Sequence, residues 1–120
     1  MKTWGWEMVC DLGYCDLASI KNPDHLKAFA SYLVDKIDMK AYGEPIVVHF
    51  GSDDKAGYTL CQLIETSNIM CHFSEDTSSA FVNVFSCKPF KSEVVLEVLE
   101  AFFNPRFIKH SFLERIAYYH

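Results

Sequence analysis

A chain of 120 residues, half of them hydrophobic and 15% aromatic, has the size and composition of one folded domain and excludes a disordered protein. Eleven basic against sixteen acidic side chains give a net charge of −5, which excludes an electrostatic affinity for nucleic acid. No stretch approaches the roughly 18 apolar residues of a membrane helix, and Glu7 and Asp11 interrupt any signal-peptide core. We therefore expect a soluble, cytoplasmic, single-domain protein over residues 1–120, with no nucleic-acid or membrane partner.

The first elements are a strand and a helix. Residues 4–12 are rich in apolar side chains and end at Gly13, which is typical of a strand. Asn22 is a favoured N-cap, and Pro23 suits the first helical position. Apolar side chains then recur every three or four residues through position 37, so the pattern predicts an amphipathic helix of about four turns.

The middle of the chain predicts four strands. They cover residues 46–50, 57–66, 69–73 and 80–87, with a break at Ser67 and Asn68 and a polar hairpin connection over residues 74–79. Such short connections require antiparallel pairing, because parallel neighbours need a crossover.

A second helix and a last strand complete the chain. After Lys88 and Pro89, polar side chains at spacings of four, three and four residues mark one face of a helix that Pro105 ends. Residues 107–112 alternate as a final strand. The predicted fold class is α+β: a two-layer sandwich of β-α-β-β-β-β-α-β order, with an antiparallel sheet and both helices on one face.

The cysteines and histidines predict neither disulfides nor a metal site. The five cysteines are an odd number without a CxxC pair, which favours a reducing compartment and free thiols, four of them core residues. The histidines lack the HExxH spacing, and the glycines are too scattered for a phosphate loop. His49, His72, Cys71 and Cys87 are the only metal-ligand candidates, but Cys71 and His72 are adjacent and would point to opposite faces of a strand, so we expect no metal.

Ser67 is the strongest candidate nucleophile. It is a small hydroxyl residue at a predicted break between strands, and His72 follows five residues later. Backbone strain at such a turn can hold a hydroxyl against the preceding carbonyl. Thr66, Ser67 and Asn68 are also ordinary turn residues, and the residue types alone favour that interpretation.

Several segments together resemble the single-domain bacterial and archaeal S-adenosylmethionine decarboxylases, which are made as proenzymes. Residues 1–5 and 14–16 resemble the family's first strand and its Cys-Asp turn, and residues 56–59 resemble its glycine-containing strand. Residues 67–72 resemble its Glu-Ser-His-x-x-x-His segment, residues 85–87 its Phe-Thr-Cys strand end, and residues 105–115 its closing strand. The specific part is the spacing of the Ser, His and Cys residues.

The resemblance implies a pyruvoyl-dependent enzyme of spermidine biosynthesis. Ser67 would cleave the Thr66–Ser67 bond and become the pyruvoyl cofactor, which forms a Schiff base with S-adenosylmethionine and accepts electrons as CO₂ leaves. His72 would assist cleavage as an acid or base, Thr59 would help processing, and Cys87 would protonate the product as general acid. The family forms homodimers with active sites near the interface, so we expect the same here.

Departures from the family pattern surround the proposed cleavage site. Thr66 replaces the usual Glu, the acid lies one residue earlier at Glu65, and Asn68 replaces a histidine. Glu65 and Trp4 are candidate substrate-binding residues, Trp4 by stacking on adenine, although Trp4 and Trp6 also fit a core or an interface. Two structural alternatives remain: His72 is a hydrogen-bonded histidine of the core or of an interface, and Cys87 is a small buried hydrophobic residue at a strand end. The function alternatives are decarboxylation of arginine or ornithine, and an uncleaved homologue that binds a nucleoside or regulates a partner enzyme.

Overall fold

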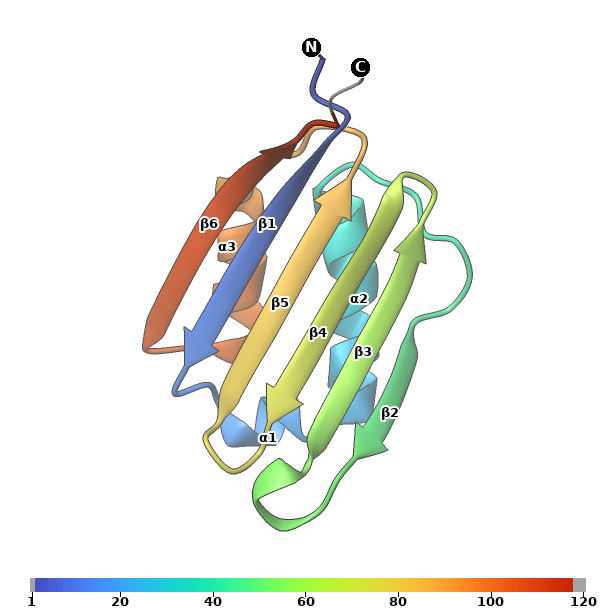
Figure 1. Cartoon of the computed structure of the whole chain (residues 1–120). Helices are drawn as coiled ribbons and strands as arrows, with labels where there is room; N and C mark the ends of the chain where they lie inside the picture. The colour runs from blue at the N-terminus through green and yellow to red at the C-terminus, as the bar shows by residue number, and fades with distance from the viewer. Residues whose placement is uncertain (1, 118–120) are drawn as a thin grey trace.

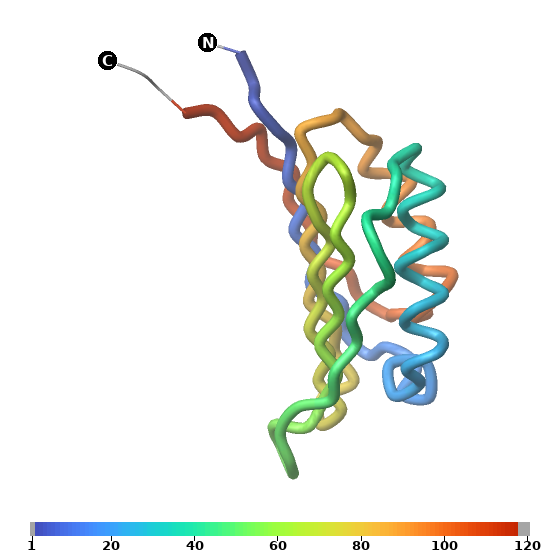
Figure 2. Tube along the Cα trace, turned by 90° about the vertical axis from the view of Figure 1, so that its right-hand side faces the viewer, coloured from blue at the N-terminus to red at the C-terminus, as the bar shows by residue number. Residues whose placement is uncertain are grey.

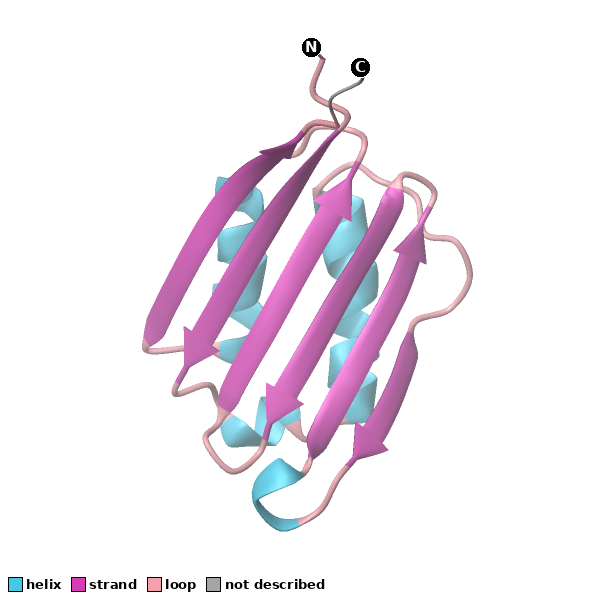
Figure 3. Ribbon diagram, viewed as in Figure 1, coloured by secondary structure: helices cyan, strands magenta, loops and turns pink. Residues whose placement is uncertain are grey.

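Six antiparallel strands form one sheet in the order β2-β3-β4-β5-β1-β6 (Figures 1 and 3). The computed structural model describes residues 2–117, so Met1 and residues 118–120 of the predicted domain lie outside the described residues. The strands are β1 (Gly5–Gly13), β2 (Ile46–Phe50), β3 (Gly57–Ile64), β4 (Ser67–Ser74), β5 (Ser79–Ser86) and β6 (Phe107–Arg115). Each neighbouring pair is antiparallel, as the short connections predict.

The helices lie on one face of this sheet, as Figure 2 shows. They are α2 (Pro23–Lys36) and α3 (Ser92–Phe103), with a one-turn helix α1 (Leu17–Ile20) and a 3₁₀ turn (Asp53–Lys55) that the sequence did not predict. The Asn22 side chain accepts hydrogen bonds from two amides of the first turn of α2, which satisfies donors that the helix leaves free. The α+β class, the element order and the one-sided helices are confirmed. None of the described helices is long and apolar enough to cross a membrane.

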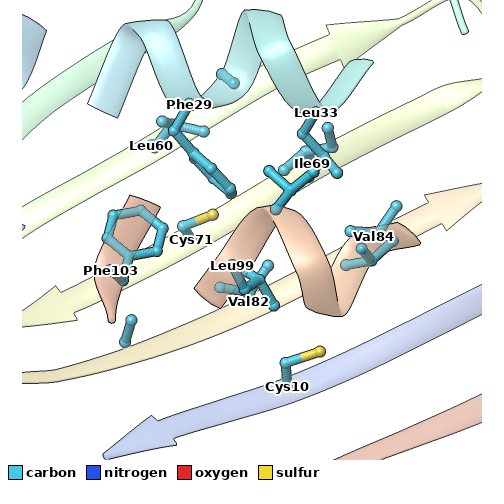
Figure 4. Packing of buried hydrophobic residues seen from close by; sticks show 14 of the residues in the cluster. Cys10, Phe29, Leu33, Leu60, Ile69, Cys71, Val82, Val84, Leu99 and Phe103 are labelled. Carbon is cyan, nitrogen blue, oxygen red and sulfur yellow. The ribbon is translucent and has the colours of Figure 1, made fainter. Parts of the chain in front are cut away.

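The core fills the space between α2, α3 and the sheet (Figure 4). Phe29 of α2 and Phe103 of α3 are fully buried and meet edge-to-face with ring centroids 4.8 Å apart. Alternate residues of β4 and β5, including Cys71 and Val82, point into the same layer. Burial of these apolar surfaces is the main stabilising contribution, at about 25 cal/mol per Å².

The other face of the sheet has no covering layer among the described residues (Figure 2). Large apolar side chains on it are half exposed, for example Phe81 at 45% and Leu113 at 46%. Because β-strand side chains alternate between faces, the register assigns His72, Thr59 and Phe81 to one row across this open face.

Strand boundaries differ from the predicted ones where three strands meet. The turn between β3 and β4 is Glu65–Thr66, and Ser67 is already the first residue of β4 rather than part of a break.

The start of β3 requires glycine at position 57 for a steric reason: a Cβ atom there would lie 1.7 Å from the carbonyl oxygen of Phe73.

Candidate active site

The Thr66–Ser67 peptide lies at the end of a tight hairpin, in the interior of the sheet. Ser67 pairs with Ile64 of β3 on one side and with Ser86 of β5 on the other. Glu65 and Thr66 form the two-residue connection, which is the shortest common hairpin loop. The backbone at Ser67 is therefore held by strands on both sides, unlike that of a free surface turn.

Cys87 is hydrogen-bonded to this peptide through its backbone. The Cys87 backbone N–H donates to the Thr66 carbonyl oxygen at 3.0 Å, and the Cys87 side chain is exposed. An amide donor aimed at a carbonyl stabilises negative charge that develops on its oxygen. The Ser67 hydroxyl has no hydrogen-bond partner among the described residues. Ser67 and Cys87, twenty residues apart in the chain, are thus brought together.

The exposed Cys87 differs from the other four thiols. Cys10, Cys15 and Cys71 are buried, and Cys61 is partly buried. Burial raises the pKa of Cys10 from 9.0 to about 12 and that of Cys15 to about 11, and it raises the pKa of Cys71 as well. Since desolvation disfavours the thiolate, these three cysteines behave as core residues.

Thr59 and His72 form a pair of their own. They are directly opposite on β3 and β4, and Thr59 Oγ1 lies 3.1 Å from His72 Nδ1, a hydrogen bond. His72 is exposed on the open face of the sheet. A hydroxyl held against an imidazole can transfer or orient a proton for a group placed at the other ring nitrogen.

The His72 pair is far from Ser67 of the same chain. Five residues along one strand span about 16 Å, and the odd spacing puts the two side chains on opposite faces. Ser67 has the same parity as buried Ile69 and Cys71, whereas His72 faces outward. The structure therefore brings Ser67 and Cys87 together but separates both from His72.

Comparison with known proteins decides the family. The sequence model described as S-adenosylmethionine decarboxylase matches residues 6–116, nearly the whole chain. The chain belongs to the S-adenosylmethionine decarboxylase family. No protein of curated function matches it. The crystal structure of the adenosylmethionine decarboxylase from Aquifex aeolicus superposes with a TM-score of 0.84, covering 99% of this chain and 96% of that one at 22% identity, and supports the fold.

The decarboxylase family uses a pyruvoyl group, and the fold places an aromatic cavity near the residues that would form it. Trp4 stacks on Phe85 with centroids 5.9 Å apart, and the Arg115 guanidinium lies 5.3 Å from the Phe85 ring centre. These three side chains line a cavity of about 180 Å³. Phe85 pairs with Asn68, the residue after Ser67, so the cavity lies beside the start of β4, on the face opposite to that of the Ser67 side chain.

Sequence reasoning missed Phe85 and Arg115 as site residues. Arg115 also hydrogen-bonds Glu7, which in turn accepts from Asn83. The alternation in β5 assigned Phe85 to a face, whereas Arg115 lies beyond the predicted last strand, residues 107–112; neither prediction carried information on which strands are neighbours. The β6-β1-β5 order, which joins both ends of the chain, creates the cluster.

The remaining predicted residues lie apart from this cluster. Glu65 is exposed in the hairpin turn, and its backbone N–H donates to the Lys40 carbonyl oxygen. His49 lies on β2 and contacts Glu75 at 2.7 Å. Residues 2–117 contain no group of three His, Cys, Asp or Glu side chains placed to hold a metal ion.

Proposed function

We propose that this chain is a proenzyme that cleaves itself between Thr66 and Ser67 and then decarboxylates S-adenosylmethionine to supply the aminopropyl donor of spermidine biosynthesis. The observation that carries the proposal is the 3.0 Å hydrogen bond from the Cys87 amide to the Thr66 carbonyl. It joins the residue whose carbonyl would be attacked to the residue whose thiol would act later, and Ser67, the attacking residue, directly follows Thr66. Membership in the decarboxylase family supplies the reaction class.

Self-cleavage would begin when the Ser67 hydroxyl attacks the Thr66 carbonyl carbon. The peptide C–N bond breaks, the Ser67 nitrogen takes the proton, and an ester links the two residues. Loss of the Ser67 α-proton then breaks the ester bond at Cβ and releases the Thr66 carboxylate. Water next hydrolyses the carbon–nitrogen bond of residue 67, which releases the nitrogen as ammonia and leaves a ketone. The Cys87 amide supports the first step, because it faces the oxygen on which negative charge develops.

The residues around the new amino end fit a pyruvoyl group. Ser67 begins β4, so cleavage exposes the group at a strand end, and exposed Cys87 is beside it. The pyruvoyl group supplies an electron sink for the loss of CO₂. Cys87, the one exposed thiol of the five, would protonate the substrate carbon as general acid.

A second copy of the chain completes the site in this proposal. His72 and Thr59 cannot reach Ser67 of their own strand, since about 16 Å separates positions 67 and 72. A two-fold copy laid with antiparallel strands on the open face would bring the partner subunit's His72 over the start of β4, where it would approach the Thr66–Ser67 peptide from the face opposite to the Ser67 side chain. The half-exposed apolar side chains on that face need such cover: Ile46, Val48, Phe50, Leu63, Phe81 and Leu113. Glu7, Asp11, Lys109 and Arg115 give the face both signs of charge, which suits self-association.

The substrate's adenine fits the aromatic cavity. Trp4 is 61% exposed and lies beside Phe85 and Arg115, so a flat purine can stack there. Phe85, one wall of the cavity, pairs with Asn68, so a nucleoside bound there would lie beside the start of β4, on the open face of the sheet. Glu65 has a weaker case as a substrate ligand, because its side chain is exposed in the turn.

Intact mass spectrometry of the purified protein tests the proposal. We expect two fragments, residues 1–66 and 67–120, with the second blocked to Edman degradation and reactive toward hydrazides. Ser67→Ala should stay intact and release no labelled CO₂ from carboxyl-labelled S-adenosylmethionine, while Ser79→Ala, at the far end of the β4–β5 hairpin, should cleave normally. A wild-type chain that remains intact and carries no carbonyl after long incubation would refute the proposal.

The altered neighbours of Ser67 favour a second candidate, an uncleaved homologue that binds a nucleoside or regulates a partner enzyme. Thr66 and Asn68 stand where the family has Glu and His, next to the bond in question. An intact chain that still binds S-adenosylmethionine in calorimetry would support this candidate. A substrate panel with arginine and ornithine separates the first proposal from decarboxylation of another amino acid.

The free thiols support a reducing, cytoplasmic location. All five cysteines are unpaired, and three of them are buried in the core. Oxidising compartments rarely keep so many thiols free in a small domain.

A further inference from the structure

A chain of hydrogen bonds holds the side chain of Thr66. The Lys88 backbone N–H donates to Ser86 Oγ at 2.9 Å, and Ser86 Oγ–H donates to Thr66 Oγ1 at 2.8 Å. Thr66 Oγ1–H in turn donates to Met39 Sδ at 3.0 Å. Ser86 Oγ also lies 3.3 Å from Met39 Sδ, a longer alternative for its one proton. The Thr66 hydroxyl therefore both donates and accepts within this part-buried set of contacts.

Two chain segments on either side of the hairpin are connected through this residue. Met39 belongs to the connection from α2 to β2, and Ser86 ends β5. The same two segments also meet where Lys88 Nζ donates to the Asp38 carbonyl oxygen at 2.6 Å. Thr66 thus lies in a slot between segments 38–40 and 86–88, with its side chain fixed by the hydroxyls and its carbonyl fixed by the Cys87 amide.

We propose that Ser86 and Met39 are positioning residues that lock Thr66 and so orient its carbonyl for attack by Ser67; this inference rests on the proposed self-cleavage. Acyl transfer within one dipeptide depends on the angle between the hydroxyl and the carbonyl, and a poorly oriented group loses much of the advantage of proximity. The Thr66 side chain and carbonyl belong to one residue, so releasing the side chain allows the peptide plane to turn away from the Cys87 amide. We call the Ser86–Thr66–Met39 contacts the Thr66 latch.

The latch also gives a physical account of the departure from the family residue at position 66. A glutamate side chain could not take the place of the Thr66 hydroxyl between Ser86 and Met39 without displacing one of them. Threonine offers one donor and one acceptor at a fixed distance from its backbone, and its β-branch limits rotation about χ1. The short, stiff side chain therefore suits a slot in which the backbone must not move.

Cleavage rates of latch variants test the inference. Thr66→Val keeps the shape of the side chain and removes both hydrogen bonds, and we expect cleavage about five- to tenfold slower, the effect of about 1 kcal/mol. Thr66→Ser keeps the hydroxyl and should restore most of the rate. Met39→Leu should give a smaller slowing, because only the sulfur acceptor is lost. Thr77→Val is the matched control, since the Thr77 hydroxyl bonds Ser74 and Ser79 at the distant end of β4.

A second measurement does not require cleavage. In the Ser67→Ala background, hydrogen exchange of the Cys87 amide reports whether the Thr66 carbonyl still accepts its proton. We expect faster exchange at Cys87 in Thr66→Val and unchanged exchange in Thr77→Val. If Thr66→Val matches wild type in both cleavage rate and Cys87 exchange, the latch inference is wrong. If the wild-type chain never cleaves, the proposed function fails, and the claim that the latch orients the peptide is judged by the exchange data: unchanged Cys87 exchange overturns it.

Discussion

Complementation between two inactive chains is the sharpest consequence of the separation between Ser67 and His72. A proton-transfer group must come within about 3 Å of its target, whereas positions 67 and 72 of one strand lie about 16 Å apart. His72→Ala chains alone should therefore cleave about a hundredfold or more slowly, the usual effect of losing an acid–base group. Ser67→Ala chains alone should not cleave at all.

Co-expression of the two variants should restore cleavage to a defined extent. In a mixed dimer, the His72→Ala chain supplies an intact Ser67 and the Ser67→Ala chain supplies an intact His72, so one of the two sites is complete. Random pairing in equal amounts puts about half of the His72→Ala chains into such dimers. Affinity tags of different mass identify the chains, and denaturing mass spectrometry should show about half of the His72→Ala chains cut and every Ser67→Ala chain intact.

The outcome separates action across subunits from action within one chain. If His72 acted only on its own Ser67, the His72→Ala chain would cleave no faster in the mixture than alone, and co-expression would add no fragment. That result, obtained with a mixed dimer demonstrated by pull-down of both tags, would refute the reasoning. Co-expression of Ser67→Ala with the Ser67→Ala, His72→Ala double variant provides the uncleavable baseline.

Three further predictions concern the substrate cavity and the core. Trp4→Ala should raise KM for S-adenosylmethionine about tenfold with a smaller change in kcat and normal self-cleavage; an unchanged KM would remove the stacking role. Leu99→Ala should lower the free energy of unfolding in urea by about 2–5 kcal/mol, because Leu99 is fully buried on the inner face of α3; a loss below about 1 kcal/mol would contradict the packing. Burial, with a smaller contribution from Asp11, raises the pKa of Cys10 to about 12, so the folded state disfavours its thiolate. Its contribution to stability is complete below pH 9 and declines as pH rises toward 12, and Cys10→Ala should show a shallower alkaline decline than wild type.

Local signals predicted the helices and most strands correctly. Asn22 and Pro23 define the start of α2 because capping and proline geometry act within one turn, and the structure has both in those roles. The sequence predicts the β3–β4 turn at Ser67 and Asn68, later than its position at Glu65 and Thr66, because serine and asparagine are common in turns. In the sheet, pairing of Ser67 with Ser86 and of Asn68 with Phe85 outweighs that local preference.

The candidate site was less predictable than the fold, because its contacts join distant segments. The spacing of Ser67, His72 and Cys87 gave their identities through the family resemblance but not their arrangement. Whether two residues of a strand share a face follows from their spacing, yet which residue of a third strand lies beside them depends on register. The contact between Cys87 and Thr66 arises only when β5 lies beside β4, and the cluster of Trp4 with Arg115 arises only when β6 lies beside β1.

The strand order also explains how such a chain could be cut and remain folded. Residues 1–66 provide β1, β2 and β3, and residues 67–120 provide β4, β5 and β6. In the sheet order β2-β3-β4-β5-β1-β6, β1 of the first fragment lies between β5 and β6 of the second. Separating the fragments would require breaking the β3–β4, β5–β1 and β1–β6 ladders and opening the core between α2 and α3. A bond at the β3–β4 hairpin can therefore break while the ladders on both sides of β4 keep residue 67 beside Cys87, which is the position that the proposed chemistry needs.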